Sequence, residues 1–592
     1  MIVRPAGSLF LMFMAVVSPL GAVEVIDPSE IQTGDTGLCI TEVEGGELLE
    51  IPVRVLGVLG SSQPRGDLVI VRLEHPRFEE TGVAAGMSGS PVYIGGRLLG
   101  ALAYSWSFAT EPIAGVTPFV HMEGLAEGED RVQAGVGSRP DLVELAEAQR
   151  QARLPEFVLD WLLPEGVGGS RLLPVAIGSG GVVGALPQDG WPAMAWRRMG
   201  WAASPVGGAR HDGIERGDLE PGAMVAGVLV SGDAFLAAGG TVTEVRDGSV
   251  WAFGHPFLGT GDIRMPLARA SVVTILPSLA NSFKMFNVGE TIGTLRSDRT
   301  HGVWGRFGEA PALLPMKVSV GATNYSYGLI DHPMLTPLLA GFMVNASHAV
   351  HGRTLGLQTV DLQLQIDFSD GAVLHLDQIF QGADSVVQGA AWTTAVLGYL
   401  SASVFTSPRM DSLTVNVDAK NGLRGATIID VVPERRKLAP GETLRLRVRL
   451  RREGGTIESL EIPIEVPINL GEGRLDVVVA DGASWAVYDL GARPFRPASF
   501  SDELRLLGRL RSSGTLVAAF ERAGTSVVLP GGTVAAPVGV VASLQAALGP
   551  HVPTAAYRVL GKVETETVGP VLGAARIKLD IRRRPGWTEE GS

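Results

Sequence analysis

The chain has 592 residues, several times the ~100 to 200 residues of a typical domain, so we expect several folding units. Its 62 acidic and 49 basic residues give a net charge of −13, which disfavours binding to nucleic acid. With 77 glycines, 37 prolines and 45% apolar residues, the composition favours short strands joined by turns and excludes an all-helical protein. The single cysteine, Cys39, excludes an intrachain disulfide and a cysteine-based zinc site.

Residues 1–22 have the plan of a secretory signal peptide. Arg4 precedes an apolar stretch over 9–17, and Gly21-Ala22 forms a small-residue end suited to cleavage. The apolar run is shorter than the ~20 residues that span a bilayer, so a membrane anchor is the weaker interpretation. The sequence therefore predicts export, to the periplasm or the cell exterior, and a mature chain without a membrane span.

Residues 23–130 consist of apolar runs separated by turn residues. The Gly95-Gly96 pair between two of these runs predicts a β-hairpin. Apolar residues spaced by threes and fours predict helix within 139–163, whereas 164–220 is rich in Gly, Pro and Trp and has no clear period. We therefore interpret 131–220 as a helical and irregular linker.

Residues 221–405 form a second strand-rich block, with a hairpin turned at Asp247-Gly248 and a helix over 388–405. From 411 to 482 apolar and polar residues alternate with a period of two, which predicts a self-contained β-sandwich. Residues 490–592 are interpreted as a further C-terminal α+β unit. A chain ending near Pro408 is accordingly expected to remain folded.

The sharpest local motif is the sequence GMSGSP, which starts at Gly86 and stands on a turn before an apolar strand. Glycines on both sides of Ser88 allow a backbone tight enough to expose its hydroxyl. The amides of Gly86 and Ser88 can then point at one spot, as in an oxyanion hole. Ser90 is an alternative nucleophile, but its place beside Pro91 favours a hydroxyl that caps the turn.

GMSGSP followed by the hairpin GGRLLGA, together with AFGHPFLGTGD at 252–262, resembles the SpoIVB-type serine peptidases of the chymotrypsin-like clan. The resemblance covers about 30–125 and 220–370. It implies a mainly β protein with a chymotrypsin-like double β-barrel core, Ser-bearing over 23–130 and His-bearing over 221–405. The serine segment precedes the histidine segment here, so the half-barrels are permuted relative to that family.

The resemblance also implies roles for individual residues. Ser88 is the nucleophile and His255 the general base that takes its proton. The family places an Asp about fifteen residues before the serine, where this sequence has Glu74-His75. Glu74 and Asp262 are equal candidates for the orienting acid, with Asp67 as a third.

Other residues enter the hypothesis as substrate contacts or as alternatives. The strand at Tyr104-Ser105-Trp106 is expected to hold an extended protein or peptide substrate by β-augmentation. Lys284 can serve as a base if it is desolvated, but its apolar neighbours favour a structural role. His348 and His351 share a helical spacing without an H-E-x-x-H pattern, so we expect no metal and no cofactor.

Two functions from different classes follow. The first is an exported serine endopeptidase that uses Ser88, His255 and a backbone oxyanion hole. The alternative is a non-catalytic binding or scaffold protein of the cell envelope that retains a peptidase-like fold. The distance between the Ser88 hydroxyl and the His255 ring distinguishes the two, because a general base must lie within about 3 Å of its proton donor.

Overall fold

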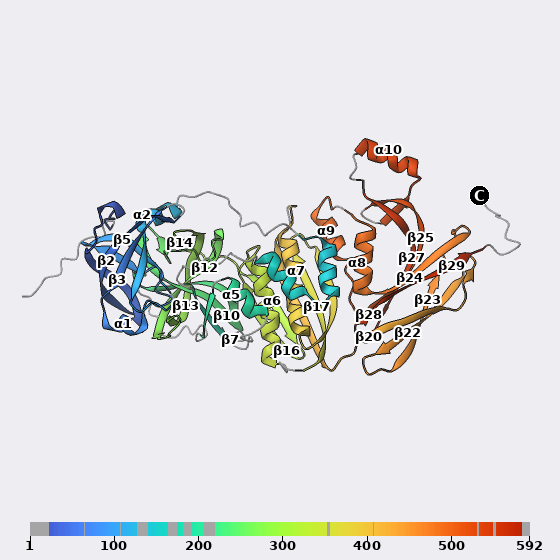
Figure 1. Cartoon of the computed structure of the whole chain (residues 1–592), viewed down its shortest axis with the longest axis horizontal. Coiled ribbons are helices and arrows are strands. Elements are labelled where there is room, and N and C mark those ends of the chain that lie inside the picture. Colours follow the sequence, from blue (N-terminus) through green and yellow to red (C-terminus); the bar gives the residue numbers. More distant parts are fainter. Residues whose placement is uncertain are drawn as a thin grey trace, which may run out of the picture.

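A computed structural model describes most of the chain, and the described part is mainly β (Figure 1). The predicted signal peptide and part of the predicted linker lie outside the described residues. No helix in the described part is long and apolar enough to cross a membrane. The described residues are 23–63, 66–106, 108–126, 140–163, 175–181, 191–199, 201–205, 219–351, 356–405, 408–495, 497–529, 532–548 and 552–582.

The first folding unit is a closed six-stranded barrel with the strand order β1-β2-β3-β6-β5-β4. The Gly95-Gly96 hairpin is confirmed, because both glycines have left-handed φ values, +58° and +81°, and join β4 to β5. The strands of the barrel are β1 (Thr36–Glu44), β2 (Glu47–Gln63), β3 (Gly66–Leu73), β4 (Pro91–Ile94), β5 (Arg97–Tyr104) and β6 (Ile113–Pro118). The short helices α1 (Pro76–Thr81) and α2 (Phe119–Glu123) follow β3 and β6.

The second unit is a further six-stranded ring within a larger sheet. Its strands pair in the order β9-β10-β11-β14-β13-β12, and β12 pairs with β9 to close the ring. The predicted hairpin at Asp247-Gly248 is confirmed as the link between β10 and β11. These strands are β9 (Met224–Gly232), β10 (Ala234–Arg246), β11 (Ser249–Ala252), β12 (Gly261–Leu276), β13 (Phe283–Arg299) and β14 (Gly302–Phe307).

The two rings share one strand order. In each, the first three strands follow one another, and the sixth, fifth and fourth close the ring back to the first. The GMSGSP turn joins the third and fourth strands of the first barrel, and the loop of His255 joins the third and fourth strands of the second. The double-barrel core expected from the sequence is present, with the serine on the first barrel and the histidine on the second.

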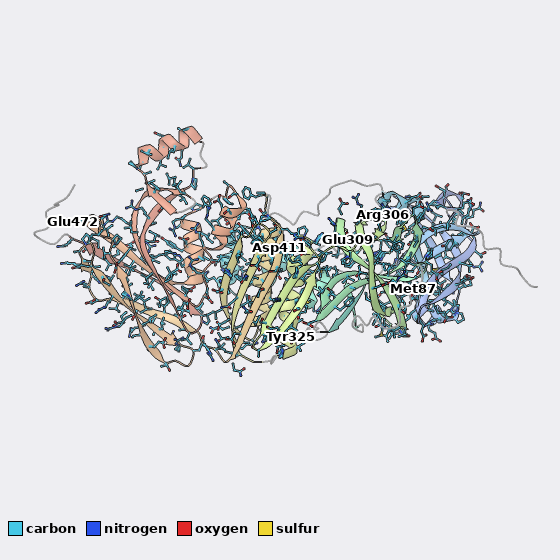
Figure 2. The ribbon with its side chains drawn as sticks, turned by 180° about the vertical axis from the view of Figure 1, so that it is seen from behind. Met87, Arg306, Glu309, Tyr325, Asp411 and Glu472 are labelled. Atoms are coloured by element: carbon cyan, nitrogen blue, oxygen red, sulfur yellow. The ribbon has the colours of Figure 1, made fainter. Side chains whose placement is uncertain are left out.

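Hydrogen bonds between buried groups hold the barrels together. The Glu42 carboxylate of β1 accepts from the amides of Met224 and Val272, at 2.9 and 2.7 Å. Ala85 makes a parallel bridge to Phe283 at the start of β13. Because a buried amide or carboxylate without a partner costs free energy, these bonds fix how the barrels face each other. Figure 2 shows Met87, the residue before Ser88, where the barrels meet.

The sheet of the second barrel continues into a layer covered by helices. Helices α6 (Leu335–His351) and α7 (Ser385–Ser401) are almost entirely buried, and α7 confirms the helix predicted over 388–405. Helices α3 (Leu142–Arg150) and α4 (Leu154–Leu162) confirm the helix predicted within 139–163. The added strands are β15 (Leu314–Val320), β16 (Thr323–Leu329), β17 (Gln358–Phe368), β18 (Val373–Gly382) and β19 (Met410–Asn421).

Part of the predicted linker belongs to this sheet. Strand β7 (Val175–Gly181) pairs with β10, and β8 (Trp201–Pro205) pairs with β7. Helix α5 (Trp191–Arg198) lies between them in sequence, and Trp191 packs edge-on against Phe342 of α6. The expectation of an irregular linker is therefore wrong for these segments, because sheet pairing with a distant strand orders them.

The boundaries predicted for the sandwich are wrong at both ends. Strand β19 pairs with β15 and β17 and so lies inside the central sheet. Strand β24 (Gly473–Asp481) pairs with β25 (Thr515–Leu529) and β29 (Ala574–Ile581) of the predicted C-terminal unit. One core combines Leu446 and Ile462 with Val477 and Phe520, so the sandwich extends from β20 to β29.

The remaining elements complete the sandwich at the orange and red end of Figure 1, and helices α8 (Gly482–Ala492) and α9 (Phe500–Leu507) also pack in the core of the central layer. A four-stranded sheet faces a larger one, and arginines at 445, 447 and 449 lie on the solvent side of β22. Helix α9 lies within the region interpreted as a C-terminal α+β unit. The others are β20 (Ala426–Pro433), β21 (Lys437–Leu438), β22 (Thr443–Arg452), β23 (Ile457–Glu465), α8 (Gly482–Ala492), β26 (Gly532–Ala535), α10 (Val538–Leu548), β27 (Thr554–Glu566) and β28 (Val571–Leu572).

Candidate active site

The turn that carries Ser88 depends on two glycines in the left-handed region. Gly86 has φ +92° and Gly89 has φ +98°, values that L side chains rarely adopt. A Cβ atom on Gly89 would lie 1.9 Å from the Thr241 carbonyl oxygen of β10. The Ser88 carbonyl in turn accepts from the Thr241 amide at 2.7 Å. Only glycine therefore allows the turn to press against the second barrel, which brings Ser88 to the interface.

The same turn leaves two amides available. Among the described residues, the amides of Gly86 and Ser88 donate to no backbone carbonyl, whereas those of Met87, Gly89 and Ser90 do. Buried amides are nearly always paired, so two amides without backbone partners beside a serine hydroxyl are an exception that needs a reason. They are the amides that the sequence predicted for an oxyanion hole. Their arrangement suits an acceptor that arrives with a substrate.

His255 is presented by a strained loop between β11 and β12. Phe253 and Gly254 have φ values of +69° and +67°, and such a value in a phenylalanine is an outlier that costs about 1 kcal/mol or more. A Cβ atom on Gly254 would lie 2.7 Å from the Cβ of Ala101, so this loop packs closely on the first barrel. The loop places His255 Nε2 2.8 Å from Ser88 Oγ.

The partners of the ring fix its protonation. His255 Nδ1 lies 2.8 Å from the carbonyl oxygen of Pro256, and a carbonyl only accepts, so Nδ1 carries the proton. In the neutral ring Nε2 is then unprotonated and accepts the hydrogen bond from Ser88. Burial lowers the pKa of His255 to about 4, partly opposed by the Pro256 carbonyl. The ring is therefore neutral at neutral pH and competent as a base.

A buried carboxylate holds the histidine loop from behind. Asp298 of β13 accepts from the amides of Phe257, Leu258 and Thr260, at 2.6, 2.9 and 3.2 Å, and from the Thr260 hydroxyl at 3.1 Å. Burial raises the pKa of the Asp298 carboxyl above its usual value, and the hydrogen bonds from the three amides oppose this only in part. Four donors are the partners that a buried carboxylate requires. Asp298 therefore fixes the backbone that follows His255 without contacting the imidazole itself.

The two predicted orienting acids lie elsewhere. The Glu74 carboxylate binds the Arg54 guanidinium at 2.6 Å, and Asp262 binds Arg299 at 2.8 Å. Both pairs are partly exposed, and both ring nitrogens of His255 have other partners. The expectation that Glu74 or Asp262 orients His255 is therefore wrong, because a backbone carbonyl occupies that position. Asp67, the third candidate, lies at the start of β3.

The predicted substrate strand begins beside the nucleophile turn. Leu102 of β5 accepts from the Gly89 amide at 2.8 Å and donates to the Ser90 carbonyl at 2.9 Å. Tyr104 ends the strand and pairs with β6, and Ser105 and Trp106 follow it. The Trp106 side chain is 42% exposed. The segment Tyr104–Trp106 thus leads from the nucleophile turn towards solvent, and its role as a substrate platform stays a prediction.

Ser90 and Lys284, the alternative catalytic residues, face away from the Ser88 hydroxyl. The Ser90 hydroxyl donates to the Met87 carbonyl at 2.7 Å, which confirms that it caps the turn. Lys284 is completely buried, and its Nζ donates to the hydroxyls of Thr41 and Thr241. Neither residue is placed to act on the Ser88 proton, which faces His255. Among the described residues, no group of three or more His, Cys, Asp or Glu could hold a metal ion.

This chain matches no family model, no curated protein and no solved structure. What can be said of its function therefore rests on the geometry of Ser88, His255 and their surroundings.

Two contributors to the site could not be identified from the sequence. The Pro256 carbonyl is part of the backbone, so residue identity carries no signal for it. Asp298 stands between Ser297 and Arg299 in a segment with several charges, where an exposed side chain is the simplest interpretation. Knowledge that 297 and 298 lie on a strand with buried side chains would have identified it, because a buried aspartate needs several donors.

Proposed function

We propose that this protein is a serine hydrolase that cleaves a protein or peptide substrate. The observation that carries the proposal is the 2.8 Å contact between Ser88 Oγ and His255 Nε2, across two barrels and 167 residues of sequence. Packing alone does not require a serine hydroxyl to donate a hydrogen bond to the lone pair of a neutral, buried histidine. It is the arrangement in which a hydroxyl becomes a nucleophile.

The chemistry follows from the bonds of the site. Ser88 Oγ attacks the scissile carbonyl carbon while its proton moves to His255 Nε2. The carbonyl oxygen becomes an oxyanion that the amides of Gly86 and Ser88, which have no backbone acceptor among the described residues, can bind. The imidazolium then gives its proton to the leaving amine, and an acyl-enzyme remains on Ser88. Water, deprotonated by the same histidine, releases the acid and restores the serine.

This mechanism differs from a Ser-His-Asp triad in the third position. The Pro256 carbonyl holds the ring in the correct tautomer but brings only a dipole to stabilise the imidazolium. We therefore expect slower turnover than a carboxylate at that position would allow. The resemblance of the GMSGSP and AFGHPF segments to SpoIVB-type peptidases supports the same reaction, and the predicted signal peptide supports export.

A second candidate is favoured by the burial of the site. Ser88 is 2% exposed and His255 is fully buried. A site closed in this way fits a non-catalytic envelope scaffold, as well as an enzyme that opens when substrate lies against Tyr104–Trp106. The two functions differ in whether Ser88 reacts.

A small fluorophosphonate, which phosphonylates an activated serine and releases fluoride, tests the proposal on the full chain. We expect covalent labelling of Ser88, identified by peptide mass, and no labelling of the Ser88→Ala or His255→Ala variants. Ser90→Ala is the matched control: it should label at Ser88, more slowly, because Ser90 supports the turn. A folded wild-type protein that does not label would contradict the hydrolase and favour the scaffold.

A further inference from the structure

Lys284 is a buried cation that the proposed reaction leaves without a role. It is the second residue of β13, and its side chain is completely buried between the barrels. Its hydrogen-bond partners are hydroxyls, Thr41 at 2.8 Å and Thr241 at 3.2 Å. The nearby Glu42 carboxylate accepts from two backbone amides. A buried ammonium that is paired with hydroxyls is costly, so its position calls for an explanation.

The backbone of Lys284 already holds one half of the predicted oxyanion hole. Its amide donates to the Ala85 carbonyl at 2.9 Å. That carbonyl belongs to the peptide unit whose N–H is the amide of Gly86. A Cβ atom on Gly86 would lie 3.1 Å from the Cβ of Lys284, so the lysine stem lies directly against this turn. In a trans peptide the N–H points away from the carbonyl, which directs the Gly86 amide away from Lys284.

The side chain holds the other half through two hydroxyls. The hydroxyls of Thr41 and Ser90 lie 2.8 Å apart, and Ser90 donates its one proton to the Met87 carbonyl at 2.7 Å. Thr41 must therefore donate to Ser90, while Lys284 donates to Thr41. This chain ends on the peptide unit whose N–H is the amide of Ser88. Chains of this kind polarise each member in turn.

A second chain runs through the other barrel. Lys284 Nζ donates to Thr241, and the Thr241 hydroxyl donates to the Gly86 carbonyl at 2.8 Å. Lys284 thus anchors three successive carbonyls, those of Ala85, Gly86 and Met87. The Gly86 carbonyl belongs to the peptide unit of the Met87 amide, which donates to the Ala84 carbonyl, so the Thr241 chain fixes the turn between the two oxyanion amides. The chain through Thr41 and Ser90 carries the charge to the peptide unit of the Ser88 amide and strengthens that N–H donor.

We propose that Lys284 is the positioning residue of the oxyanion hole. Its ammonium group polarises the Ser88 amide through Thr41 and Ser90, and it holds the turn through Thr241 and through its own backbone amide. The inference rests on the proposed hydrolase function. It assigns Lys284 no contact with substrate and no proton transfer with Ser88. The proposed role requires the Lys284 amine to be protonated.

Because the proposal depends on the charge of Lys284, it predicts a pH dependence of the labelling rate that a purely structural lysine would not produce. Burial lowers the pKa of Lys284 to about 8, while Glu42 and Cys39 on β1 oppose the shift. Burial raises the pKa of the Cys39 thiol to about 12, so that group stays neutral near pH 8. The rate of labelling should therefore fall as pH rises through about 8, because the neutral amine no longer polarises the relay.

The experiment measures the fluorophosphonate reaction of the full chain from pH 5 to 10. In Lys284→Met, the maximal rate of labelling should fall roughly ten- to a hundredfold, with probe affinity unchanged, since the loss of one oxyanion donor costs roughly a hundred- to a thousandfold. The alkaline decline near pH 8 should disappear in this variant. A folded Lys284→Met that labels at the wild-type rate with an unchanged pH profile overturns the inference and leaves the hydrolase standing.

Thr41 supplies a pair of variants that keeps the test decisive if Lys284→Met does not fold. Thr41→Val retains the shape but breaks the relay, and it should slow labelling roughly tenfold. Thr41→Ser retains the hydroxyl and should restore the wild-type rate. Equal rates in the two variants overturn the inference. A wild-type protein that does not label overturns both the inference and the proposed function.

Discussion

The burial of His255 sets the pH range in which the site can work. A histidine base is active when neutral, and the pKa of His255 lies at about 4 because burial disfavours the imidazolium. Because the pKa is lowered, His255 becomes protonated, and labelling is lost, at a lower pH than for an exposed histidine, whose pKa is ~6.5. We expect labelling to be constant from pH 5 to 7 and to fall with a midpoint near 4. The rate between pH 3 and 8, with circular dichroism at each point, measures this; a midpoint near 6.5 would show that water enters the site.

Asp298 holds His255 in place through the backbone of the loop that follows the histidine. The amide variant Asp298→Asn tests this role. Asn at 298 would present an NH₂ group to the N–H groups of the 257–260 loop, which repel it. We expect Asp298→Asn to slow labelling roughly tenfold or more, because a displaced base loses its near-attack geometry. Labelling kinetics of the folded variant measure the effect.

Glu74 and Asp262 are the matched controls for that variant. Each lies in a partly exposed ion pair of the kind that contributes only about 0 to 1 kcal/mol. Glu74→Gln and Asp262→Asn should label within about twofold of the wild-type rate. A slow Glu74→Gln or Asp262→Asn variant beside a normal Asp298→Asn would restore the original assignment.

Single glycines decide whether whole elements fit together. An Ala at 89 combines a left-handed backbone, about 1 to 2 kcal/mol, with a contact to the Thr241 carbonyl that forces overpacking, about 1 to 3 kcal/mol. Gly89→Ala should therefore lower the free energy of unfolding by about 2 to 5 kcal/mol and abolish labelling. Gly95→Asn is the control, because a Cβ there has no heavy atom within 4 Å and Asn tolerates this backbone. Urea denaturation compares the two; equal stability would show that the Ser88 turn does not depend on close packing.

Local signals in the sequence predicted local structure well. The hairpins at Gly95-Gly96 and Asp247-Gly248 depend on the conformations of the turn residues themselves, so a dipeptide was enough. The residues of β7 and β19 carry strand-like or glycine-rich patterns, but their partners are far away in sequence. Alternation in β19 fitted a sandwich and a central sheet equally well, since both bury one strand face. Pairing with β15 and β17, which no local pattern encodes, settled the boundary.

The candidate site likewise contains residues that a local sequence pattern predicts and residues that only the tertiary structure brings together. Ser88 could be predicted because a serine between two glycines is itself a local turn signal. His255 followed only from the resemblance of its segment to a known family. Asp298 and the Pro256 carbonyl depend on how β13 passes behind the histidine loop, and this is tertiary information. The sequence therefore predicted that Ser88 and His255 belong to one site, but not the groups that hold them.

At the scale of the whole molecule, the two barrels are built alike. Both close in the same strand order, and each carries one residue of the Ser88–His255 pair between its third and fourth strands. An exchange of the two barrels in sequence therefore preserves the site, because each loop still projects towards the shared interface. Ser88 before His255 is compatible with the same geometry as the reverse order, because a Ser-His pair depends on the positions of the two side chains and not on their order in the chain.

The position of β19 changes where the chain can be cut. Its Leu413, Val415 and Val417 are at most 2% exposed in the core of the central sheet, and burial of three such side chains is worth roughly 5 to 8 kcal/mol. That loss is comparable to the ~5 to 15 kcal/mol by which a domain is stable. A chain ending at Pro408 should therefore aggregate and fail to label, contrary to the expectation from sequence.

A chain ending at Arg424 retains β19 and should therefore be more stable than the chain ending at Pro408. Its last residues bond to the sheet, since the Arg424 amide donates to the Thr359 hydroxyl at 3.1 Å. It loses the side chains of Leu490, Phe500 and Leu507, which are buried in the same core, so its free energy of unfolding should still fall by several kcal/mol, roughly 1.5 to 3 for each. Labelling at Ser88 should continue, because the site lies wholly within the barrels. Size-exclusion chromatography and fluorophosphonate labelling of the two truncations side by side decide the matter: a soluble, reactive chain ending at 408 would mean that β19 belongs with the sandwich after all.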